Sequence, residues 1–237
     1  MGLAAAGCAG SGQIAGNGPG AVGLFTTLPI LWAESDDLRG LLRSDLPPNW
    51  VLTALRARGE VKPVDNLMPG KSAPILSGVG LLVMAQPRPL APQENVSLDN
   101  WVRGGGRVLL FADPMLTEDS AYSIGDRRRP QDIVLLSPIL SRWGLRLEFD
   151  DRQPGGEKLA DFAGEPMPVN LPGQLVILDP KQGCTLLGAG LAARCRIGKG
   201  RVLVLADAAL LEQERGPGPE SHRLALDRLL AEIQTWN

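Results

Sequence analysis

The sequence contains few of the side chains that carry out covalent chemistry. Its 237 residues include one histidine, His222, and three dispersed cysteines, Cys8, Cys184 and Cys195. A serine or cysteine hydrolase needs a nucleophile beside a base, yet the sequence has no Gly-x-Ser-x-Gly elbow and no cysteine directly after a parallel-strand pattern. One histidine and scattered cysteines also lack the spacing of a zinc site. We therefore expect a protein that is not an enzyme and that binds no metal and no cofactor.

Net charge and long apolar runs are scarce as well. The formal charge is −2 and the pI is near 5.5, so the chain lacks the clustered positive charge that attracts nucleic acid or an anionic membrane surface. No apolar run approaches the roughly 20 residues that span a bilayer. We expect no nucleic-acid partner and no direct membrane span in this chain.

Glycine and proline, in contrast, are abundant. The 29 glycines and 20 prolines predict short helices that are separated by long loops. Residues 1–20 are rich in glycine and alanine, and the stretch that ends at Cys8 looks like the end of a bacterial lipoprotein signal without its charged start. This segment is either a processing remnant, with Cys8 lipidated, or a disordered tail. Residues 21–237 are expected to form a single domain, and a periplasmic or membrane-associated lipoprotein location is favoured over the cytoplasm.

The stretch from Gly80 to Pro114 predicts the centre of the fold. An apolar strand at Leu81–Ala85 is followed by a helix at about Gln93–Arg103, a glycine turn and a second apolar strand at Val108–Ala112. Both strands lack polar alternation, which is expected when helices cover both faces of a sheet. The helix is long enough to connect two parallel strands. The stretch therefore predicts a βαβ unit.

The flanking patterns extend this unit towards the N-terminus. Expected are a first strand, two short helices and a short edge strand that contains Pro63: Val22–Thr26, Asp37–Leu42, Trp50–Arg58 with Asn49 as its cap, and Val61–Val64. Proline cannot donate to a strand ladder, so the last of these belongs at or near an edge.

The C-terminal half predicts further strands and a closing helix. Leu145–Phe149 is expected beside the other strands of the sheet, and residues 150–173 are expected to form a loop. Strands are then predicted at Gln174–Asp179, Cys184–Gly188, Leu191–Ile197 and Arg201–Ala206, and Ser221 is expected to cap a terminal helix that buries Leu226, Leu230 and Ile233.

Cys184 and Cys195 lie at matching distances from Ala189 and Gly190. They face each other if this segment forms a hairpin that turns at those two residues. Two interpretations stay open, a cross-strand disulfide and two buried free thiols, because opposed hairpin positions need suitable local geometry to be bridged.

Polar residues follow the predicted strands and form the candidate ligand site. In open α/β sheets, ligands bind outside the carboxyl ends of the strands. Thr26, Thr27, Gln86, Asp113 and Asp207 occupy such positions, and both aspartates directly follow apolar strands. The alternative is that each aspartate binds nearby main-chain N–H groups and fixes a turn.

Two further features have competing interpretations. The run Arg127–Arg129 either binds an acidic partner or forms a solvated loop. His222 is expected to be an ordinary, solvated residue in the first turn of the terminal helix.

The central stretch resembles a known family. The shared pattern is an apolar strand ending at Pro87, a helix that begins near Pro92 and Glu94, Trp101 before a glycine turn, and a strand that ends in Asp113-Pro114. It is similar to the auxiliary-domain family of uncharacterised ABC-type transport systems, which includes a gliding-motility transporter component and a related intraflagellar transport domain. The resemblance implies a class I glutamine-amidotransferase-like fold without catalytic residues.

Together, the patterns and the resemblance predict a three-layer α/β fold. Its mostly parallel sheet is of the flavodoxin-like or class I amidotransferase-like type, with an antiparallel C-terminal hairpin. The expected function is a non-catalytic accessory or binding domain, as an extracytoplasmic component of an ABC-type transport system, with permease or ATPase subunits as partners. The alternatives are a small-molecule binder or hydrolase-like enzyme with a site at the strand ends, and a protein-interaction adaptor that binds through its long loops.

Overall fold

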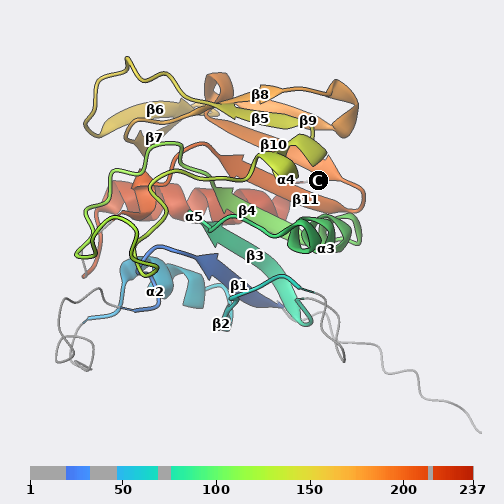
Figure 1. The fold of residues 1–237 in the computed structure, drawn as a ribbon, viewed down its shortest axis with the longest axis horizontal. Helices are drawn as coiled ribbons and strands as arrows, with labels where there is room; N and C mark the ends of the chain where they lie inside the picture. Colours follow the sequence, from blue (N-terminus) through green and yellow to red (C-terminus); the bar gives the residue numbers. More distant parts are fainter. Residues whose placement is uncertain (1–19, 33–46, 69–75, 213–215, 237) are drawn as a thin grey trace, which may run out of the picture.

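The fold is built around a seven-stranded sheet (Figure 1). The computed structural model describes residues 20–32, 47–68, 76–212 and 216–236. The strand order in the sheet is β2-β1-β3-β4-β11-β10-β9. In chain order its strands are β1 Ala21–Thr26, β2 Val61–Pro63, β3 Val79–Ala85, β4 Arg107–Phe111, β9 Cys184–Leu187, β10 Ala192–Ile197 and β11 Gly200–Leu205. The five strands from β2 to β11 are parallel, and β10 and β9 continue the sheet in antiparallel pairing.

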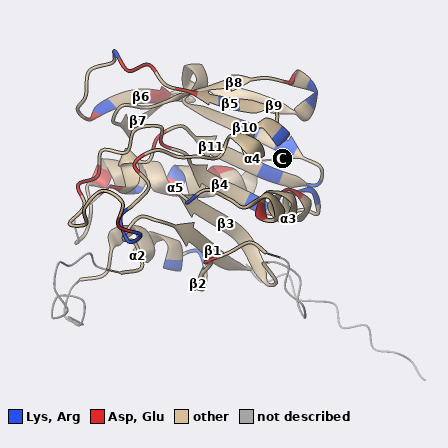
Figure 2. Ribbon diagram, viewed as in Figure 1, with Lys and Arg blue, Asp and Glu red and all other residues tan. Residues whose placement is uncertain are grey.

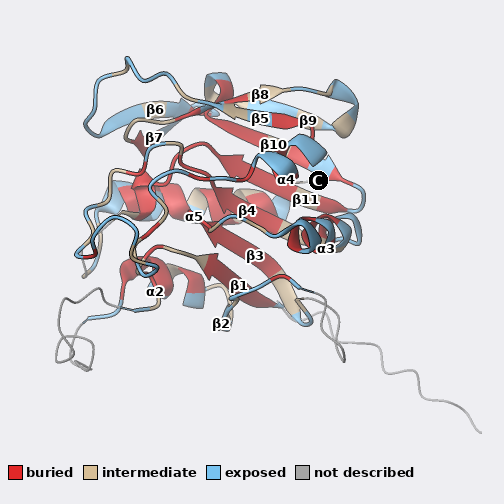
Figure 3. Ribbon diagram, viewed as in Figure 1, coloured by how far each residue is buried: buried red, intermediate tan, exposed pale blue. Residues whose placement is uncertain are grey.

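Helices cover both faces of this sheet, which explains why the central strands lack polar alternation. One apolar core contains buried residues of α2 (Trp50–Arg56) and α5 (Glu220–Thr235), and the other contains those of α3 (Pro92–Arg103) and α4 (Ser137–Arg142). The middle strands are buried throughout most of their length (Figure 3). The predicted three-layer, mostly parallel α/β fold with an antiparallel C-terminal hairpin is confirmed.

The predicted βαβ unit is present with nearly the expected bounds. β3 and β4 pair in parallel, and α3 connects them. Glu94 stabilises the start of α3, because its carboxylate accepts from the main-chain N–H groups of Ala91 and Leu67 and pairs with Arg88 at 2.8 Å. A Cβ on Gly106 would overlap the indole of Trp101, so any larger residue at that position would force the indole or the turn after α3 to move.

The N-terminal half also follows the sequence pattern. Asn49 caps α2 by accepting from the main-chain N–H of Val51 at 2.8 Å. β2, which contains Pro63, is an edge strand as expected. The predicted helix Asp37–Leu42 and residues 1–19, including Cys8, lie outside the described residues, and the division into a tail and one domain stays a prediction.

Two predictions for residues 145–179 are wrong. β5 (Leu145–Glu148) does not join the main sheet but pairs antiparallel with β8 (Gln174–Ile177) in a separate two-stranded sheet. Within the expected loop 150–173, residues Lys158–Phe162 and Glu165–Val169 form the hairpin β6–β7. Both small sheets lie in the upper part of Figure 1, β5–β8 near β9 and β6–β7 to the left. The loop prediction failed because β7 contains two prolines, which an edge strand tolerates.

The start of the terminal helix also differs from expectation. α5 begins at Glu220 after Pro219, so Ser221 is not its cap. His222 is buried rather than solvated: its Nε2 lies 2.9 Å from a carboxylate oxygen of Glu157, and its Nδ1 lies 3.1 Å from the carbonyl oxygen of Leu210. Glu157 lies just before β6, within the predicted loop 150–173. The predicted apolar face of α5 is buried as expected.

Cys184 and Cys195 form a disulfide across the antiparallel pair β9–β10, with a Cα–Cα distance of 4.0 Å. Of the two interpretations, the disulfide is the one that the structure contains. The bond attaches the short edge strand β9 covalently to β10, in addition to the hydrogen bonds between the two strands.

Breaking this disulfide should destabilise the protein. The two cysteines are 11 residues apart, and closing a loop of this length corresponds to a loss of about 2.5 kcal/mol in the free energy of unfolding for Cys195→Ser. Urea unfolding with and without reductant measures this effect. Cys8→Ser is the matched control, because it keeps both bridged cysteines and should respond to reductant like the wild type. A wild-type midpoint that is insensitive to reductant would contradict the prediction.

Candidate functional site

The candidate site lies where the connections of the sheet diverge. The chain leaves β1 towards α2 on one face of the sheet and leaves β3 towards α3 on the other. Because β1 and β3 are neighbours, their carboxyl ends form a topological switch point, where ligands of open α/β sheets bind. The loop that follows β4 lies over this edge (Figure 1).

Thr26 and Thr27 end β1 and use their hydroxyl groups within the protein. Thr26 Oγ1 donates to the carbonyl of Ala85 at 2.8 Å and accepts from the N–H of Leu28 at 2.9 Å. Thr27 Oγ1 donates to the carbonyl of Gln86 and accepts from the N–H of Gln131. These bonds join the ends of β1 and β3 to the loop after β4.

Gln86 is the central connector of this edge. It is fully buried and has a positive φ of 42°, which is uncommon for a residue other than glycine. Its Oε1 accepts from the N–H of Asp113 at 3.0 Å, and its Nε2 donates to the carbonyls of Asp113 and Gln131 at 3.0 and 2.8 Å. The side-chain amide therefore pairs with the main chain beyond β4 as another strand would.

Asp113 and Asp207 extend from neighbouring parallel strands and are both buried. The carboxylate of Asp113 accepts from the N–H groups of Met115 and Ala208, and that of Asp207 accepts from those of Asn170 and Ala209, at 2.8 to 3.0 Å. This is the turn-fixing geometry that the sequence offered as the alternative to ligand binding, and their role as ligand contacts stays a prediction.

Burial changes the protonation of these two carboxyl groups. Desolvation raises the pKa of Asp113 to about 7, against the opposing effect of its two main-chain hydrogen bonds, and the nearby Glu212 raises it further. The pKa of Asp207 is also raised, mainly by burial and next by the charge of Asp113. The two groups therefore favour a protonated state that an exposed aspartate would not have near neutral pH.

Glu212 is a third acid at this edge that sequence reasoning missed. Its two carboxylate oxygens accept from the N–H and the hydroxyl of Thr117 at 2.9 and 2.7 Å, and the same hydroxyl accepts from Asn170 Nδ2. Burial raises the pKa of Glu212. An acid that directly follows the apolar run of residues 208–211 was the one available signal. Within the described ranges, no group of three or more His, Cys, Asp or Glu has the arrangement of a metal site.

An open cleft of about 430 Å³ lies at the end of β1. It is lined by hydroxyl, aromatic and arginine side chains: Thr26, Thr27, Trp32, Tyr122, Arg127 and Arg128. Of the five predicted site residues, Thr26 and Thr27 thus reach a cleft, while Gln86, Asp113 and Asp207 lie buried at the same edge. Sequence reasoning considered the arginine run but did not place it beside the threonines.

The arginines of the run Arg127–Arg129, of which Arg127 and Arg128 line the cleft, differ in their partners. The guanidinium of Arg128 lies 4.1 Å from the centre of the Tyr122 ring and pairs with Asp126 at 2.7 Å, and Arg129 pairs with Asp132 at 2.8 Å. Arg127 is exposed and has no ion-pair partner among the described residues. Figure 2 shows that the loop carries basic and acidic segments close together.

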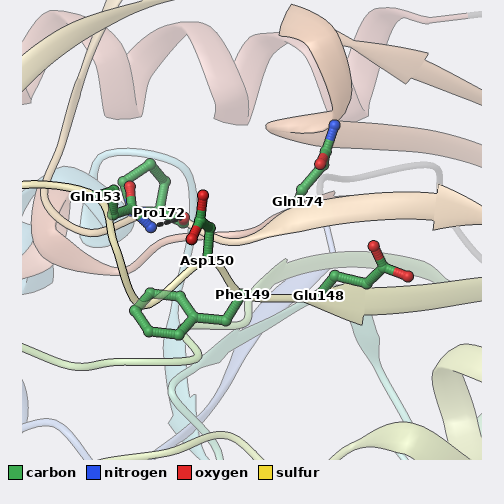
Figure 4. Close-up of a pocket in the computed structure, with 6 residues that line it drawn as sticks. All are labelled: Glu148, Phe149, Asp150, Gln153, Pro172 and Gln174. Atoms are coloured by element: carbon green, nitrogen blue, oxygen red, sulfur yellow. Dashed lines mark hydrogen bonds between the residues drawn. The ribbon is translucent and has the colours of Figure 1, made fainter.

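A smaller pocket of about 270 Å³ lies near β5 and β8 (Figure 4). It is lined by Glu148, Phe149, Asp150, Gln153, Pro172 and Gln174. The amide of Gln153 donates to the carbonyl of Pro172 at 2.8 Å. Both acids already pair with arginines, Glu148 with Arg146 and Asp150 with Arg152. This pocket therefore offers no uncompensated charge to a ligand, unlike the cleft at β1.

The chain is thus an α/β domain in which the buried polar side chains at the strand ends form hydrogen bonds with the main chain of the same domain. The chain belongs to the family described as ABC-type uncharacterized transport system, whose model matches residues 21–151. No curated protein matches the chain. None of the helices in the described ranges has the length and apolar character needed to cross a membrane.

Solved structures share the fold at low sequence identity. The mmIFT52 N-terminal domain has a TM-score of 0.53 and 11% identity, with 92% of this chain and 98% of that chain covered. Cytoplasmic Protein STM1381 from Salmonella typhimurium LT2 has a TM-score of 0.50 and 11% identity, with 90% and 98% covered. Gan42B, a GH42 beta-galactosidase from G. stearothermophilus, has a TM-score of 0.51 and 12% identity, with 92% of this chain covered. The chain spans 30% of Gan42B and 34% of an exo-beta-1,4-mannosidase from Opitutaceae bacterium strain TAV5.

Proposed function

We propose that the chain is a non-catalytic accessory domain of an ABC-type transport system and that it acts outside the cytoplasm. Membership of the transport-system family is the observation that carries the accessory role. The proposal includes kinship with the gliding-motility and intraflagellar transport domains and with class I amidotransferase-like folds. The likeness to the mmIFT52 domain is compatible with it, at the level of the fold.

The Cys184–Cys195 bond supports a location outside the cytoplasm. Disulfides persist in oxidising compartments such as the bacterial periplasm and are rare where thiols are kept reduced. A periplasmic or membrane-associated domain is therefore the better fit to a chain that ties its edge strand with such a bond.

The geometry of the strand ends supports a role without catalysis. A glycosidase needs two carboxyl groups that flank a substrate bond, whereas Asp113 and Asp207 are fully buried and accept from main-chain N–H groups. Cys184 and Cys195 form the disulfide and so are not free thiols that could act as nucleophiles. His222 is buried, and each of its ring nitrogens lies within hydrogen-bond distance of an oxygen atom of Leu210 or Glu157. The described residues thus offer no nucleophile beside a base.

The accessory role predicts recovery of transport subunits with this protein. The tagged full chain, purified from its native host in mild detergent, should retain identified permease and ATPase subunits. The loop after β4 exposes Ile124 (88%) and Ile133 (52%), which makes it the candidate docking segment. Ile124→Asp should therefore lower the recovery several-fold, and Leu159→Asp, at a 65% exposed position on β6, is the matched control.

The outcomes separate two ideas. Equal recovery with wild type and both variants would contradict docking through the loop but leave the accessory role intact. Absence of permease and ATPase subunits from every purification would contradict the accessory role itself.

A second candidate function is small-molecule binding at the strand ends. The cleft beside Thr26 and Thr27 favours it, because it lies at the switch point of the sheet and has both polar and aromatic walls.

A further inference from the structure

We propose that the cleft at the end of β1 binds a small organic anion that carries a planar ring, with Arg127 holding the anionic group and Trp32 contacting the ring. This inference deepens the second candidate function and rests on it, and it is independent of the transport role. The shared ligand chemistry is a carboxylate or phosphate group next to a flat ring.

The size and position of the cleft suit such a ligand. A volume of about 430 Å³ lies within the range of roughly 300 to 1,000 Å³ that small-molecule sites occupy. The cleft lies at the carboxyl end of β1, next to β3 in the sheet, and the connections of these two strands run to opposite faces. The position and size of the cleft do not identify the chemical class of the ligand. That class is inferred from the side chains that line the cleft.

The charge of the lining favours an anion. Arg128, which lines the cleft, pairs with the carboxylate of Asp126, and the neighbouring Arg129 pairs with that of Asp132. Arg127 lines the same cleft, is exposed and has no ion-pair partner within the described ranges. Among the residues that the structure describes, the lining of the cleft therefore carries one positive charge without an ion-pair partner. A guanidinium presents a planar fork of donors that matches a carboxylate or phosphate in two-point contact, which is why these two anions are proposed.

The aromatic lining favours a ring beside that anion. Trp32 is 39% exposed and lines the cleft, so its indole offers an apolar, flat surface to a ligand. Tyr122 also lines the cleft, but it is buried and the guanidinium of Arg128 lies 4.1 Å from the centre of its ring, so Trp32 supplies the open aromatic surface. A ligand with an anionic group alone would leave the exposed indole of Trp32 without a contact.

The floor of the cleft is held in place before any ligand binds. The hydroxyl groups of Thr26 and Thr27 already bond to the main chain of β3's carboxyl end and to Leu28 and Gln131. They therefore supply shape and position rather than spare hydrogen bonds. A rigid floor lowers the ordering cost of binding, so modest contacts can give measurable affinity.

Calorimetric titration of the full chain tests the proposal. The probes are benzoate and adenosine 5′-monophosphate, which join a ring to a carboxylate and to a phosphate. The comparators are benzamide and adenosine, which lack the charge, and acetate and inorganic phosphate, which lack the ring. At least one ring-bearing anion should bind saturably, and its comparators should bind about tenfold more weakly, a difference of about 1.4 kcal/mol. The stronger of the two probes identifies the anion.

Variants assign the binding to the cleft. Arg127→Gln should lower the affinity for the ring-bearing acid about tenfold, to the affinity of its neutral comparator. Trp32→Ala should lower the affinity for the same acid towards that of the anion without a ring. Arg152→Gln removes an exposed arginine outside the cleft, and it should bind the probes like the wild type. Circular dichroism checks that each variant is folded.

Three results would overturn the inference. One is the absence of saturable binding of both ring-bearing acids up to about 10 mM. The second is equal affinity for an acid and its neutral or ringless comparator. The third is unchanged affinity in folded Arg127→Gln. None of them bears on the recovery of permease and ATPase subunits, so failure of the ligand site and failure of the accessory role can be told apart.

Discussion

Gln86→Ala should lower the free energy of unfolding by about 3 kcal/mol, which is large for one polar substitution. The change removes the three hydrogen bonds of a fully buried side chain and leaves the main-chain N–H of Asp113 without a partner in a site that water does not reach, whereas the carbonyl of Asp113 still accepts from the N–H of Val134. An orphaned buried polar group costs roughly 1 to 3 kcal/mol, so the loss of partners outweighs the small loss of apolar contact. Urea unfolding at constant pH measures the difference.

Two further glutamine variants provide comparisons for the size of this loss of stability. Gln153→Ala removes the bond to the carbonyl of Pro172 and an exposed, longer bond that Gln153 Oε1 accepts from Lys158 Nζ, at a partly exposed position, and it should cost less than about 1 kcal/mol. Gln86→Glu keeps the acceptor for the Asp113 N–H but cannot donate when ionised, so its effect should be severe as well. If Gln86→Ala were no more destabilising than Gln153→Ala, the connecting role of Gln86 would be wrong.

The central part of the fold could be predicted because its signals are local. β3, α3 and β4 are encoded by two uninterrupted apolar stretches, a helix with Glu94 near its start and a glycine turn. The strand ends followed from the same pattern, since a polar residue after a buried strand must lie at the edge of the sheet. That Gln86 binds main chain across 27 residues could not be predicted, because the contact depends on which strands are neighbours.

The outer strands could not be placed from the sequence. β5 alternates as an ordinary strand does, and nothing in its residues distinguishes a place in the main sheet from pairing with β8. In β7, Pro166 and Pro168 argued against a strand, but they occupy alternate positions of a two-stranded hairpin that has a free edge. The burial of His222 follows from the segment that leads into this hairpin and could not be expected without it.

Only part of the lining of the cleft could be predicted from the sequence. Thr26 and Thr27 were identified by their place after β1, but Tyr122 and Arg127 come from a loop some hundred residues further along the chain. An irregular loop has no periodicity from which its path can be derived. Its position depends on bonds such as that from the N–H of Gln131 to Thr27 Oγ1, which join residues 104 positions apart.

The second large effect is a fall in stability as the pH rises from about 5 to about 7. The folded-state pKa of Asp113 is about 7, whereas its ordinary value is 3.8, and the pKa of Asp207 is raised as well. Between these values the folded protein keeps a proton that the unfolded chain has lost. The stabilising contribution is therefore complete below the unfolded-state pKa and is lost as the pH rises through the folded-state pKa. Each such proton gives a slope of about −1.4 kcal/mol per pH unit, so the loss is on the order of 3 kcal/mol.

Asp113→Asn tests the origin of this slope. Asparagine offers one acceptor oxygen to the N–H groups of Met115 and Ala208 where the carboxyl group offers two, so the variant is less stable overall, but it cannot release a proton. Urea unfolding at several pH values should therefore give a shallower dependence, by about one proton. Asp126→Asn is the control. The ion pair with Arg128 lowers the pKa of Asp126 to about 2, so Asp126 is fully ionised throughout the range from pH 5 to pH 7 and should not change the slope. Glu94, whose pKa is also about 2, contributes with the opposite sign but only at lower pH. An unchanged slope in Asp113→Asn would show that Asp113 is already ionised in the folded protein, and the strand ends would then hold a buried charge rather than a proton.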